Sequence, residues 1–323
     1  MMHVYACRDK ALHQVHAELS ESLPDGTVWI DMIEPTKDEE RSVERNLAID
    51  IPTREEMREI EASSRIYHEN DALYMSLNVI ARASTGNPET SSITFILIHG
   101  KLVTVRYADP LPFRTFLAHS LHQSGLCETG AAVCVGLIEA IVDRVADILE
   151  GVGGEVDKLS QEVFGAPGGS PDTRVLQRVL AQIGRNGDLA SRARDSLTTI
   201  TRVGAYLSQA AKAHGNAELT ERSNTLVQDI ASINDYLNFL ANKVTFLLDA
   251  TLGMISIEQN LIVKIFTVFM VVFTPPTLVA SIYGMNFKLM PELDWHWGYP
   301  VALVLMLLSG ILPYAWFKRR GWL

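Results

Sequence analysis

The chain has 323 residues, of which 47% are hydrophobic and 20% charged, and its formal net charge is −10 at pH 7. A net negative charge argues against a nucleic-acid-binding protein. The sequence has neither a glycine-rich phosphate loop followed by lysine nor a nucleophile elbow, so it predicts no enzyme and no resident cofactor. The cysteines Cys7, Cys127 and Cys134 lack metal-ligand spacing and are typical of reduced thiols in a cytosolic domain.

Residues 1–110 predict an α/β subdomain. Short runs rich in β-branched and aromatic residues, bounded by turn residues, predict strands at Thr27–Met32, Ala72–Ala81, Ile93–Ile98 and Leu102–Tyr107. A threonine followed by acidic residues marks the start of two predicted helices, Thr36–Leu47 and Thr53–Ala62. His99 and Gly100 predict a tight hairpin turn between the last two strands.

Residues 111–216 predict a helical subdomain, and residues 217–264 predict a stalk helix. Helical periodicity covers Ala131–Val163 and resumes from about Asp172 to Ala213, after a cluster of glycine and proline residues. In the stalk, the seam positions alternate in steps of three and four, as in a coiled coil: Leu226, Ile230, Ile233, Leu237, Leu240, Val244, Leu247, Thr251 and Met254. Such a seam indicates either an oligomer or an intramolecular sheath of helices.

Two uncharged segments near the C-terminus predict transmembrane helices at residues 265–283 and 299–317. Each would span about 28 Å as a helix, close to the hydrocarbon thickness of a bilayer, which is about 30 Å. The N-terminus lacks a signal peptide, and Lys318, Arg319 and Arg320 of the tail at 318–323 follow the second span directly. The sequence therefore predicts a multi-pass inner-membrane protein in contact with the lipid bilayer, with both termini in the cytoplasm.

A stripe of polar residues follows one face of the first predicted span and the end of the stalk. Asn260, Thr267, Thr274 and Ser281 recur every seven residues, a step that drifts by only about 20° on a helix, and Thr277 lies beside them. Small hydroxyl side chains are common at contacts between membrane helices, so one interpretation is helix packing. The other is a pore wall that bonds to the water shell of a cation, because the stripe has no carboxylate and Mg²⁺ gives up its waters reluctantly.

The loop at 284–298 carries further candidates. We expect Gly284 to end the helix with a positive φ, which would place the amide oxygen of Asn286 at the outer mouth. Glu292 and Asp294 make the loop net negative. A ring of such acids either concentrates cations at the mouth or is merely solvated.

The motifs Tyr-Gly-Met-Asn-Phe at 283–287, Met-Pro-Glu-Leu at 290–293 and Lys-Arg-Arg-Gly-Trp-Leu at 318–323 resemble the CorA magnesium-channel family, part of the CorA/ZntB metal ion transporter superfamily. The resemblance implies a homopentamer whose subunits each line the pore with their first span. It implies that Gly284, Met285 and Asn286 form the entrance, where a ring of asparagines holds a cation through its hydration shell. It also implies that Asn260, Thr274, Thr277 and Ser281 line the pore, and Thr267 joins these candidates because it lies on the same stripe.

The resemblance further implies gating and regulatory residues. Val263 and Phe266 fall at hydrophobic pore positions just inside the membrane, where a gate closes by dewetting. Asp249 resembles an acidic family position near the region where cytoplasmic Mg²⁺ binds between subunits and holds such channels closed. Many relatives have glycine where this chain has Ser281, so the family's pore width does not carry over to that position.

The predicted fold is an α+β soluble domain, comprising a layered α/β subdomain and long stalk helices, with two C-terminal transmembrane helices. The predicted function is a gradient-driven channel for hydrated Mg²⁺, with Co²⁺ and Ni²⁺ as further substrates and cytoplasmic Mg²⁺ as regulator. One alternative is a ZntB-like Zn²⁺ transporter, with or without proton coupling, although such relatives tend to carry valine in place of Met285. Another is a membrane-anchored scaffold or sensor, which needs neither the hydroxyl stripe nor Asn286.

Overall fold

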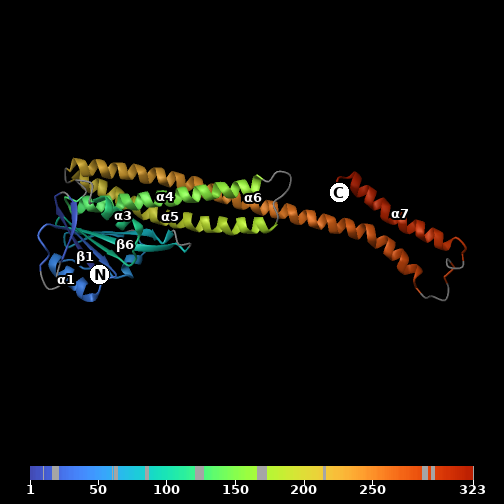
Figure 1. The fold of residues 1–323 in the computed structure, drawn as a ribbon, viewed down its shortest axis with the longest axis horizontal. Helices are drawn as coiled ribbons and strands as arrows, with labels where there is room; N and C mark the ends of the chain where they lie inside the picture. Colours follow the sequence, from blue (N-terminus) through green and yellow to red (C-terminus); the bar gives the residue numbers. More distant parts are fainter. Residues whose placement is uncertain are drawn as a thin grey trace. The chain divides into compact units, whose positions relative to one another are not determined.

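The computed structural model describes residues 1–9, 11–16, 22–59, 61, 65–83, 87–120, 127–165, 173–213, 216–285, 290–291 and 295–322. The chain divides into two compact units. The first comprises Met1–Gln161 and Ala181–Leu247, and the second comprises Glu162–Leu180 and Leu248–Leu323. Figure 1 shows the elements in chain order.

A seven-stranded mixed sheet forms the centre of the first unit, with strand order β2-β1-β3-β7-β6-β5-β4. Its strands are β1 (Met2–Arg8), β2 (Ala11–Val15), β3 (Thr27–Ile33), β4 (Ile66–Glu69), β5 (Ala72–Ala81), β6 (Glu89–Ile98) and β7 (Lys101–Arg106). Strands β3 and β7 pair in parallel, and the other neighbours pair antiparallel. The hairpin between β6 and β7 turns at His99 and Gly100, whose φ values of 47° and 73° are both left-handed, as a two-residue hairpin turn requires.

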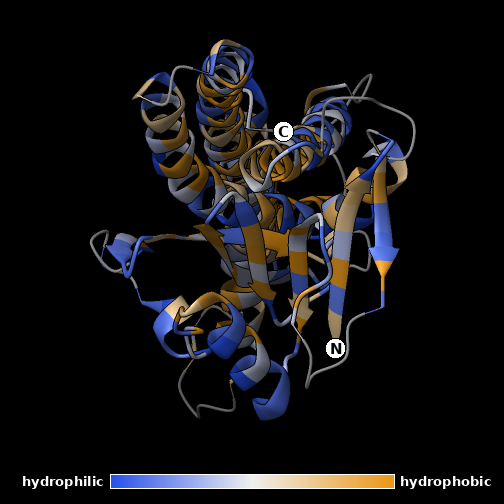
Figure 2. Ribbon diagram, turned by 90° about the vertical axis from the view of Figure 1, so that its left-hand side faces the viewer, coloured by the Kyte–Doolittle hydropathy of each residue, from blue (hydrophilic) through white to orange (hydrophobic). Residues whose placement is uncertain are grey.

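Helix α1 (Lys37–Leu47) packs on one face of this sheet. Thr36 and Glu39 form a capping box, in which each side chain bonds to the other residue's backbone N–H. Val43 and Leu47 of α1 belong to the apolar core with sheet residues such as Ile96. Figure 2 shows α1 on the opposite side of the sheet from the long helices.

The other face of the sheet packs against α3 (Leu111–Ser120). Trp29 of β3 is fully buried there, with its ring centroid 6.2 Å from that of Phe113 and 6.0 Å from that of Phe116. Because both faces of the sheet are covered, strands β3, β5 and β7 are buried almost throughout. The strands therefore sit between two helical layers, which is an α/β arrangement.

The long helices are α4 (Gly130–Phe164), α5 (Thr173–Ala213) and α6 (Ala217–Tyr283). Within the first unit, a Cβ added at Gly153 of α4 would lie 3.5 Å from Leu240 of α6. One added at Gly204 of α5 would lie 3.1 Å from Ile230 of α6. The seam residues Leu226, Ile230, Leu237, Leu240 and Leu247 are all buried. The seam in this unit therefore packs against helices of the same chain. This is the intramolecular sheath, one of the two arrangements that the seam predicted.

The second unit contains the C-terminal part of α6 and helix α7 (Gly298–Arg319). Both helices contain a segment long and apolar enough to cross a membrane, and only 6% and 11% of those segments, respectively, are buried within the chain. Residues 162–180 of this unit include the end of α4 and the start of α5, where Arg178 forms an ion pair with Glu162 at 2.7 Å.

Two sequence predictions differ from the structure of the first unit. Within the described part of the predicted helix Thr53–Ala62, the structure has only a short 3-10 helix, η1 (Glu56–Arg58), although Thr53 and Glu56 do form the expected cap. Ile60 and Ala62 lie outside the described residues. Met57 is the buried residue of η1, and the described residues around it from Thr53 to Glu59 are exposed, so this part has no apolar stripe that would hold a longer helix against the sheet. Strands β1, β2 and β4 were not predicted, because β2 and β4 are partly exposed edge strands and the apolar run of β1 is only Val4–Cys7.

Candidate functional site

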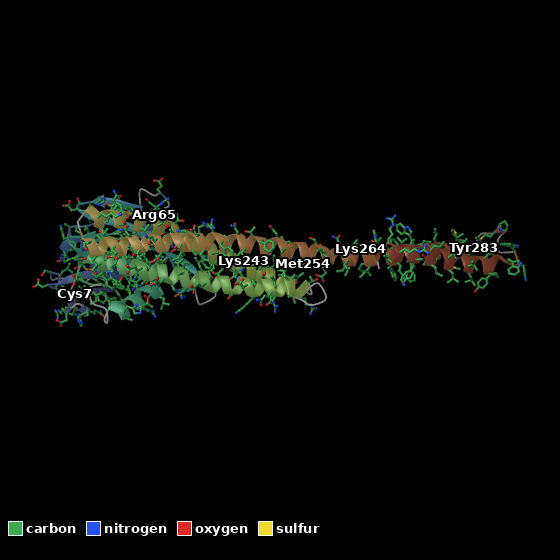
Figure 3. All side chains as sticks on the ribbon, turned by 90° about the horizontal axis from the view of Figure 1, so that it is seen from above. Cys7, Arg65, Lys243, Met254, Lys264 and Tyr283 are labelled. Carbon is green, nitrogen blue, oxygen red and sulfur yellow. The ribbon has the colours of Figure 1, made fainter. Side chains whose placement is uncertain are left out.

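Helix α7 runs antiparallel to the C-terminal part of α6 and contacts one face of it. A Cβ added at Gly310 of α7 would lie 3.4 Å from the carbonyl oxygen of Val272 and 3.5 Å from Cγ of Pro276. Further along, the ammonium group of Lys264 lies 6.0 Å from the ring centroid of Trp322. Figure 3 labels Lys264 and Tyr283 along this stretch of α6. The face of α6 that carries Val272 and Pro276 is therefore its packed face within the chain.

The polar stripe lies on the opposite face of α6. Successive residues of an α-helix are rotated by about 100°, so the direction of each side chain follows from its number. Counted from Val272, the candidate pore residues all fall within about 60° of the opposite direction: Asn260, Val263, Phe266, Thr267, Thr274, Thr277 and Ser281. Contact with α7 within the same chain therefore does not explain the stripe.

The stripe is open to the surroundings of the chain. Asn260, Thr274, Thr277 and Ser281 are exposed, and Thr267 is partly buried. The two candidate gate residues are also exposed, Val263 to 60% and Phe266 to 61%. This face is available for lipid, for water or for another copy of the chain.

Two hydroxyl groups of the stripe, those of Thr267 and Thr277, donate to the helix backbone. Thr267 Oγ1 donates to the carbonyl of Val263 at 2.8 Å. Thr277 Oγ1 lies within hydrogen-bonding distance of the carbonyls of Phe273, at 3.0 Å, and Thr274, at 2.8 Å. Because the hydroxyl proton is directed at the backbone, the oxygen lone pairs remain for acceptance from outside. The stripe therefore offers hydrogen-bond acceptors without charge.

The prolines Pro275 and Pro276 lie within α6 at the level of the stripe. Proline has no N–H, so the carbonyls of Val271 and Val272 lose their usual helical donors. The carbonyl of Val272 is the one that faces Gly310. The absence of a side chain at Gly310 lets α7 approach this carbonyl closely and shield it.

Helix α6 ends at Tyr283, and Gly284 follows in a turn. The N–H of Gly284 donates to the carbonyl of Ala280 at 2.9 Å, which continues the helical pattern by one residue. The expectation of a positive φ at Gly284 was wrong, since the left-handed glycines of the described chain are Gly26, Gly100 and Gly321. A side chain at Gly284 would instead crowd the backbone, because a Cβ there would lie 3.2 Å from the oxygen of Ala280.

The structure describes some of the remaining predicted site residues and not others. Met285 is 46% exposed after the end of α6. Asn286, Glu292 and Asp294 lie outside the described residues. Asp249 is exposed on α6, about 20° around the helix from Asn260, so it lies on the same side as the stripe.

Sequence reasoning did not single out Glu258 for a role of its own. Its Oε2 atom is buried and finds no hydrogen-bond partner among the residues that the structure describes. The sequence could have drawn attention to Glu258, because it is a carboxylate about two helical turns before a membrane span. Ionisable groups near such segments are costly to bury without a partner. Over the described ranges, no three His, Cys, Asp or Glu side chains gather closely enough to hold a metal ion.

Most of the chain is similar to known proteins of one family. A profile described as "CorA-like Mg2+ transporter protein" matches residues 24–319. The chain belongs to the CorA-like Mg²⁺ transporter family. It is 34% identical over 323 residues to the magnesium transport protein CorA of Salmonella typhimurium, and 33% identical to that of Escherichia coli strain K12, covering 100% of both chains in each case.

The fold agrees with this CorA assignment. The structure matches that of the CorA magnesium transporter from Methanocaldococcus jannaschii with a TM-score of 0.77, at 18% identity, over 100% of this chain and 99% of that one. The resemblance expected from the motifs at 283–293 and 318–323 is confirmed, and so is the predicted fold class with its two C-terminal transmembrane helices. The roles of the individual CorA site residues remain predictions.

Proposed function

We propose that several copies of this chain form a channel in the inner membrane that conducts hydrated Mg²⁺ down its electrochemical gradient. The observation that carries the proposal is the position of the polar stripe on α6, opposite the face packed by α7. Two spans cannot enclose a pore alone, so the stripes of several chains must meet around an axis. A homopentamer is the proposed assembly, by analogy with the family that the sequence motifs indicate.

The chemistry of the stripe suits a hydrated cation. Water molecules bound to a cation point their hydrogen atoms outward, so a wall that receives them must accept hydrogen bonds. Thr267 and Thr277 donate their protons to the backbone and leave their oxygens as acceptors. A wall without carboxylates keeps the water shell in place, which suits Mg²⁺ because this ion dehydrates reluctantly.

The proposed entrance is the Gly284, Met285 and Asn286 motif. Helix α6 ends one residue before it, so the motif follows directly after the pore-lining helix. In an assembly, Asn286 from each copy would hold the ion through its water shell, and Glu292 and Asp294 would raise the local concentration of cations.

The membrane potential supplies the driving force. A divalent cation that crosses 100 mV gains about 4.6 kcal/mol, twice the value for a single charge. Inward flow then needs no energy-coupling site. This direction assumes that the termini and the first unit are cytoplasmic, as the charge of the tail at 318–323 predicts.

The proposed gate is the hydrophobic constriction at Val263 and Phe266. Both are exposed on the stripe face, so in an assembly they would narrow and dry the pore. Mg²⁺ on the cytoplasmic side is the proposed regulator, bound between subunits near the exposed Asp249. Mg²⁺ is thus both substrate and regulator, and no resident cofactor is proposed.

The selectivity test is Mg²⁺ flux into liposomes that contain the purified protein. Asn286→Ala should abolish Mg²⁺ flux without loss of assembly, whereas Asn87→Ala, an exposed loop residue of the first unit, should leave the flux unchanged. Comparing Mg²⁺, Zn²⁺, Co²⁺ and Ni²⁺, with and without a pH gradient, separates this proposal from a Zn²⁺ transporter coupled to protons. Normal Mg²⁺ flux in Asn286→Ala would remove the proposed entrance. Absence of flux for every ion would favour a scaffold or sensor.

The assembly and regulation have tests of their own. The purified protein should have the mass of five chains in detergent, and a monomer would rule out the channel.

Proteolysis of the first unit should slow as the Mg²⁺ concentration rises into the millimolar range, and Asp249→Asn should weaken that protection. Protection that is equal in both proteins would remove Asp249 from the regulatory site.

A further inference from the structure

A pocket lined by arginines lies wholly within the first unit and includes none of the candidate pore residues. It has a volume of about 260 Å³ and is lined by Arg54, Arg58 and Arg65 together with polar residues of the sheet. We refer to it as the arginine pocket. Three guanidinium groups around one cavity require an explanation in a chain with a net charge of −10.

The floor of the arginine pocket is a polar extension of an otherwise apolar sheet face. Alternate residues of a strand point to the same face, and Ile96 and Ile98 of β6 point into the core beneath α1. On the same face, Thr94 comes next and hydrogen-bonds to Ser76 of β5, and Ser92 and Thr90 then continue the row and line the pocket. Ser92 Oγ donates to Asn78 Oδ1 of β5 at 3.0 Å. The face thus changes from apolar to polar where the pocket begins.

Arg65 is the innermost of the three arginines. Its side chain is only 9% exposed, and its Nε donates to the carbonyl of Glu59 at 2.8 Å. Its Nη1 is buried and has no hydrogen-bond acceptor within the described part of the chain. Burial lowers the pKa of Arg65, and the positive charge of Arg202 lowers it further. The negative charge of Asp195 raises it by a smaller amount. A buried donor with positive charge and no acceptor is costly, and it indicates a missing anionic partner.

Arg54 and Arg58 form the outer part of the pocket. Arg58 ends η1, and Arg54 precedes it with its guanidinium 5.3 Å from the ring centroid of Tyr107. Both side chains are exposed, so the pocket opens to solvent at this end. Among the described residues that line the cavity, none is acidic. The like charges are therefore gathered without a carboxylate inside the pocket to neutralise them.

We propose that the arginine pocket binds a phosphate anion, either free or in the phosphate chain of a nucleotide. Guanidinium groups bind tetrahedral oxyanions through paired N–H···O bonds, and the hydroxyl groups of the floor supply weaker donors. The cavity is smaller than a typical site for a drug-sized ligand, about 300–1,000 Å³, which suits a small anion or the phosphate portion of a larger molecule. The unpaired Nη1 of Arg65 receives its acceptor from the bound phosphate.

Calorimetric titration of the full-length protein in detergent tests this proposal. The probes are inorganic phosphate, pyrophosphate and ATP, in a buffer free of Mg²⁺ and at constant ionic strength. We expect saturable binding of at least one probe with one site per chain. Arg58→Gln should weaken that binding about tenfold or more, whereas Arg41→Gln, an exposed arginine on α1, should not. Binding of inorganic phosphate identifies a free-anion site, and binding of ATP alone identifies a nucleotide phosphate chain.

Thermal unfolding of Arg65→Met is a second measurement. It distinguishes an arginine that binds phosphate from one that only stabilises the fold. Without phosphate, this variant should unfold at the same temperature as wild type or higher, because it removes an unpaired buried charge. With phosphate, only wild type should gain thermal stability. If Arg65→Met unfolded below the wild-type temperature by the same amount with and without phosphate, the proposal would be overturned.

Two other results would also overturn it. One is the lack of saturable binding of all three probes, and the other is equal affinity in wild type and Arg58→Gln. If wild type binds no probe and Arg58→Gln loses its oligomeric state, the pocket receives a carboxylate from a second copy instead. None of these measurements requires ion conduction, so they stand apart from the test of the channel.

Discussion

The two units of the chain differ in where their apolar side chains lie. In the first unit, residues such as Trp29 and Phe95 are fully buried between a sheet and helices of the same chain. In the second unit, the two apolar helical segments are only 6% and 11% buried. The first unit therefore owes its stability to contacts within the chain, whereas the second depends on what surrounds it, lipid or further copies.

Polar groups follow the same division. In the first unit, the buried carboxylate of Asp31 accepts from Arg106 at 2.8 Å and from Thr104 at 2.7 Å. In the second unit, the hydroxyl groups of Thr267 and Thr277 bond to the backbone of their own helix, and no charged partner is near them in the stripe. Breaking a buried ion pair should therefore change stability in the first unit, whereas removing a hydroxyl group of the stripe should change ion flux in the second.

The largest effect is expected at the ion pair of Asp31 and Arg106, which are 1% and 4% exposed. Asp31→Asn removes the buried counter-charge of Arg106 and leaves its guanidinium with only the partly exposed carboxylate of Asp109. The loss should be about 3 kcal/mol of unfolding free energy. Urea denaturation measures this loss. Asp38→Asn, which removes an exposed partner of Arg41, should change the free energy by about 0.5 kcal/mol at most. Similar values for both variants would contradict the comparison.

A smaller loss is expected from Gly130→Ala, at the start of α4. A Cβ at this position would lie only 2.3 Å from the backbone carbon of Lys101, so the helix must shift away from the hairpin between β6 and β7. Overpacking of this kind should cost about 1–3 kcal/mol, measured by thermal unfolding. Gly151→Ala in the same helix meets no atom within 4 Å and should be neutral or slightly stabilising. Tolerance of both substitutions would show that the first unit is loosely packed.

In the second unit, Thr274→Val should change function and not stability. It replaces a hydroxyl on the exposed stripe by a methyl in every copy, which removes an acceptor from the proposed pore wall. We expect Mg²⁺ flux to fall about tenfold, equivalent to about 1.4 kcal/mol in the barrier, with an unchanged unfolding temperature. Thr225→Val, on the part of α6 that belongs to the first unit, is the matched control. Flux that is unaffected by Thr274→Val would indicate that the stripe faces lipid.

The smallest effect concerns the pH dependence of the first unit. Burial alone would raise the pKa of Asp109, but hydrogen bonds from Arg114 and Arg106 outweigh it and lower the pKa below the ordinary value of 3.8. A lowered pKa stabilises the folded state above pH 3.8, and this contribution disappears as the pH falls through the folded-state pKa. The stability difference between wild type and Asp109→Asn should be about 1 kcal/mol or less at pH 7, since the carboxylate is partly exposed, and should vanish in acid. A difference that persists in strong acid would contradict this origin.

Much of the fold could be predicted because its central strands are buried on both faces. Strand β5 has the predicted bounds Ala72–Ala81, and β3 extends only one residue beyond the prediction Thr27–Met32. Edge strands such as β2 carry polar residues, including His13 and Gln14, and bury only one side, so their pattern is weak. The seam of the stalk was visible in the sequence, but periodicity cannot distinguish a partner helix in the same chain from one in another copy.

The candidate pore residues could be predicted because a seven-residue step defines a helix face without knowledge of tertiary contacts. The structure adds where that face lies relative to α7. The arginine pocket could not be predicted in this way. Its residues extend from Arg54 to Tyr107, and they meet only because β5 and β6 pair beside η1. No spacing rule links residues that are brought together by strand pairing and by a short 3-10 helix.

The two prolines in α6 have a mechanical consequence. Elsewhere along the helix, a change of curvature must stretch backbone hydrogen bonds. At Pro275 and Pro276 two of these bonds are already absent, so the helix bends there with less resistance than at other positions. Gly310 lies against this point and offers no side chain that would obstruct the movement. The most easily bent point of α6 thus coincides with a close contact with α7, so bending of α6 there changes how the two helices pack.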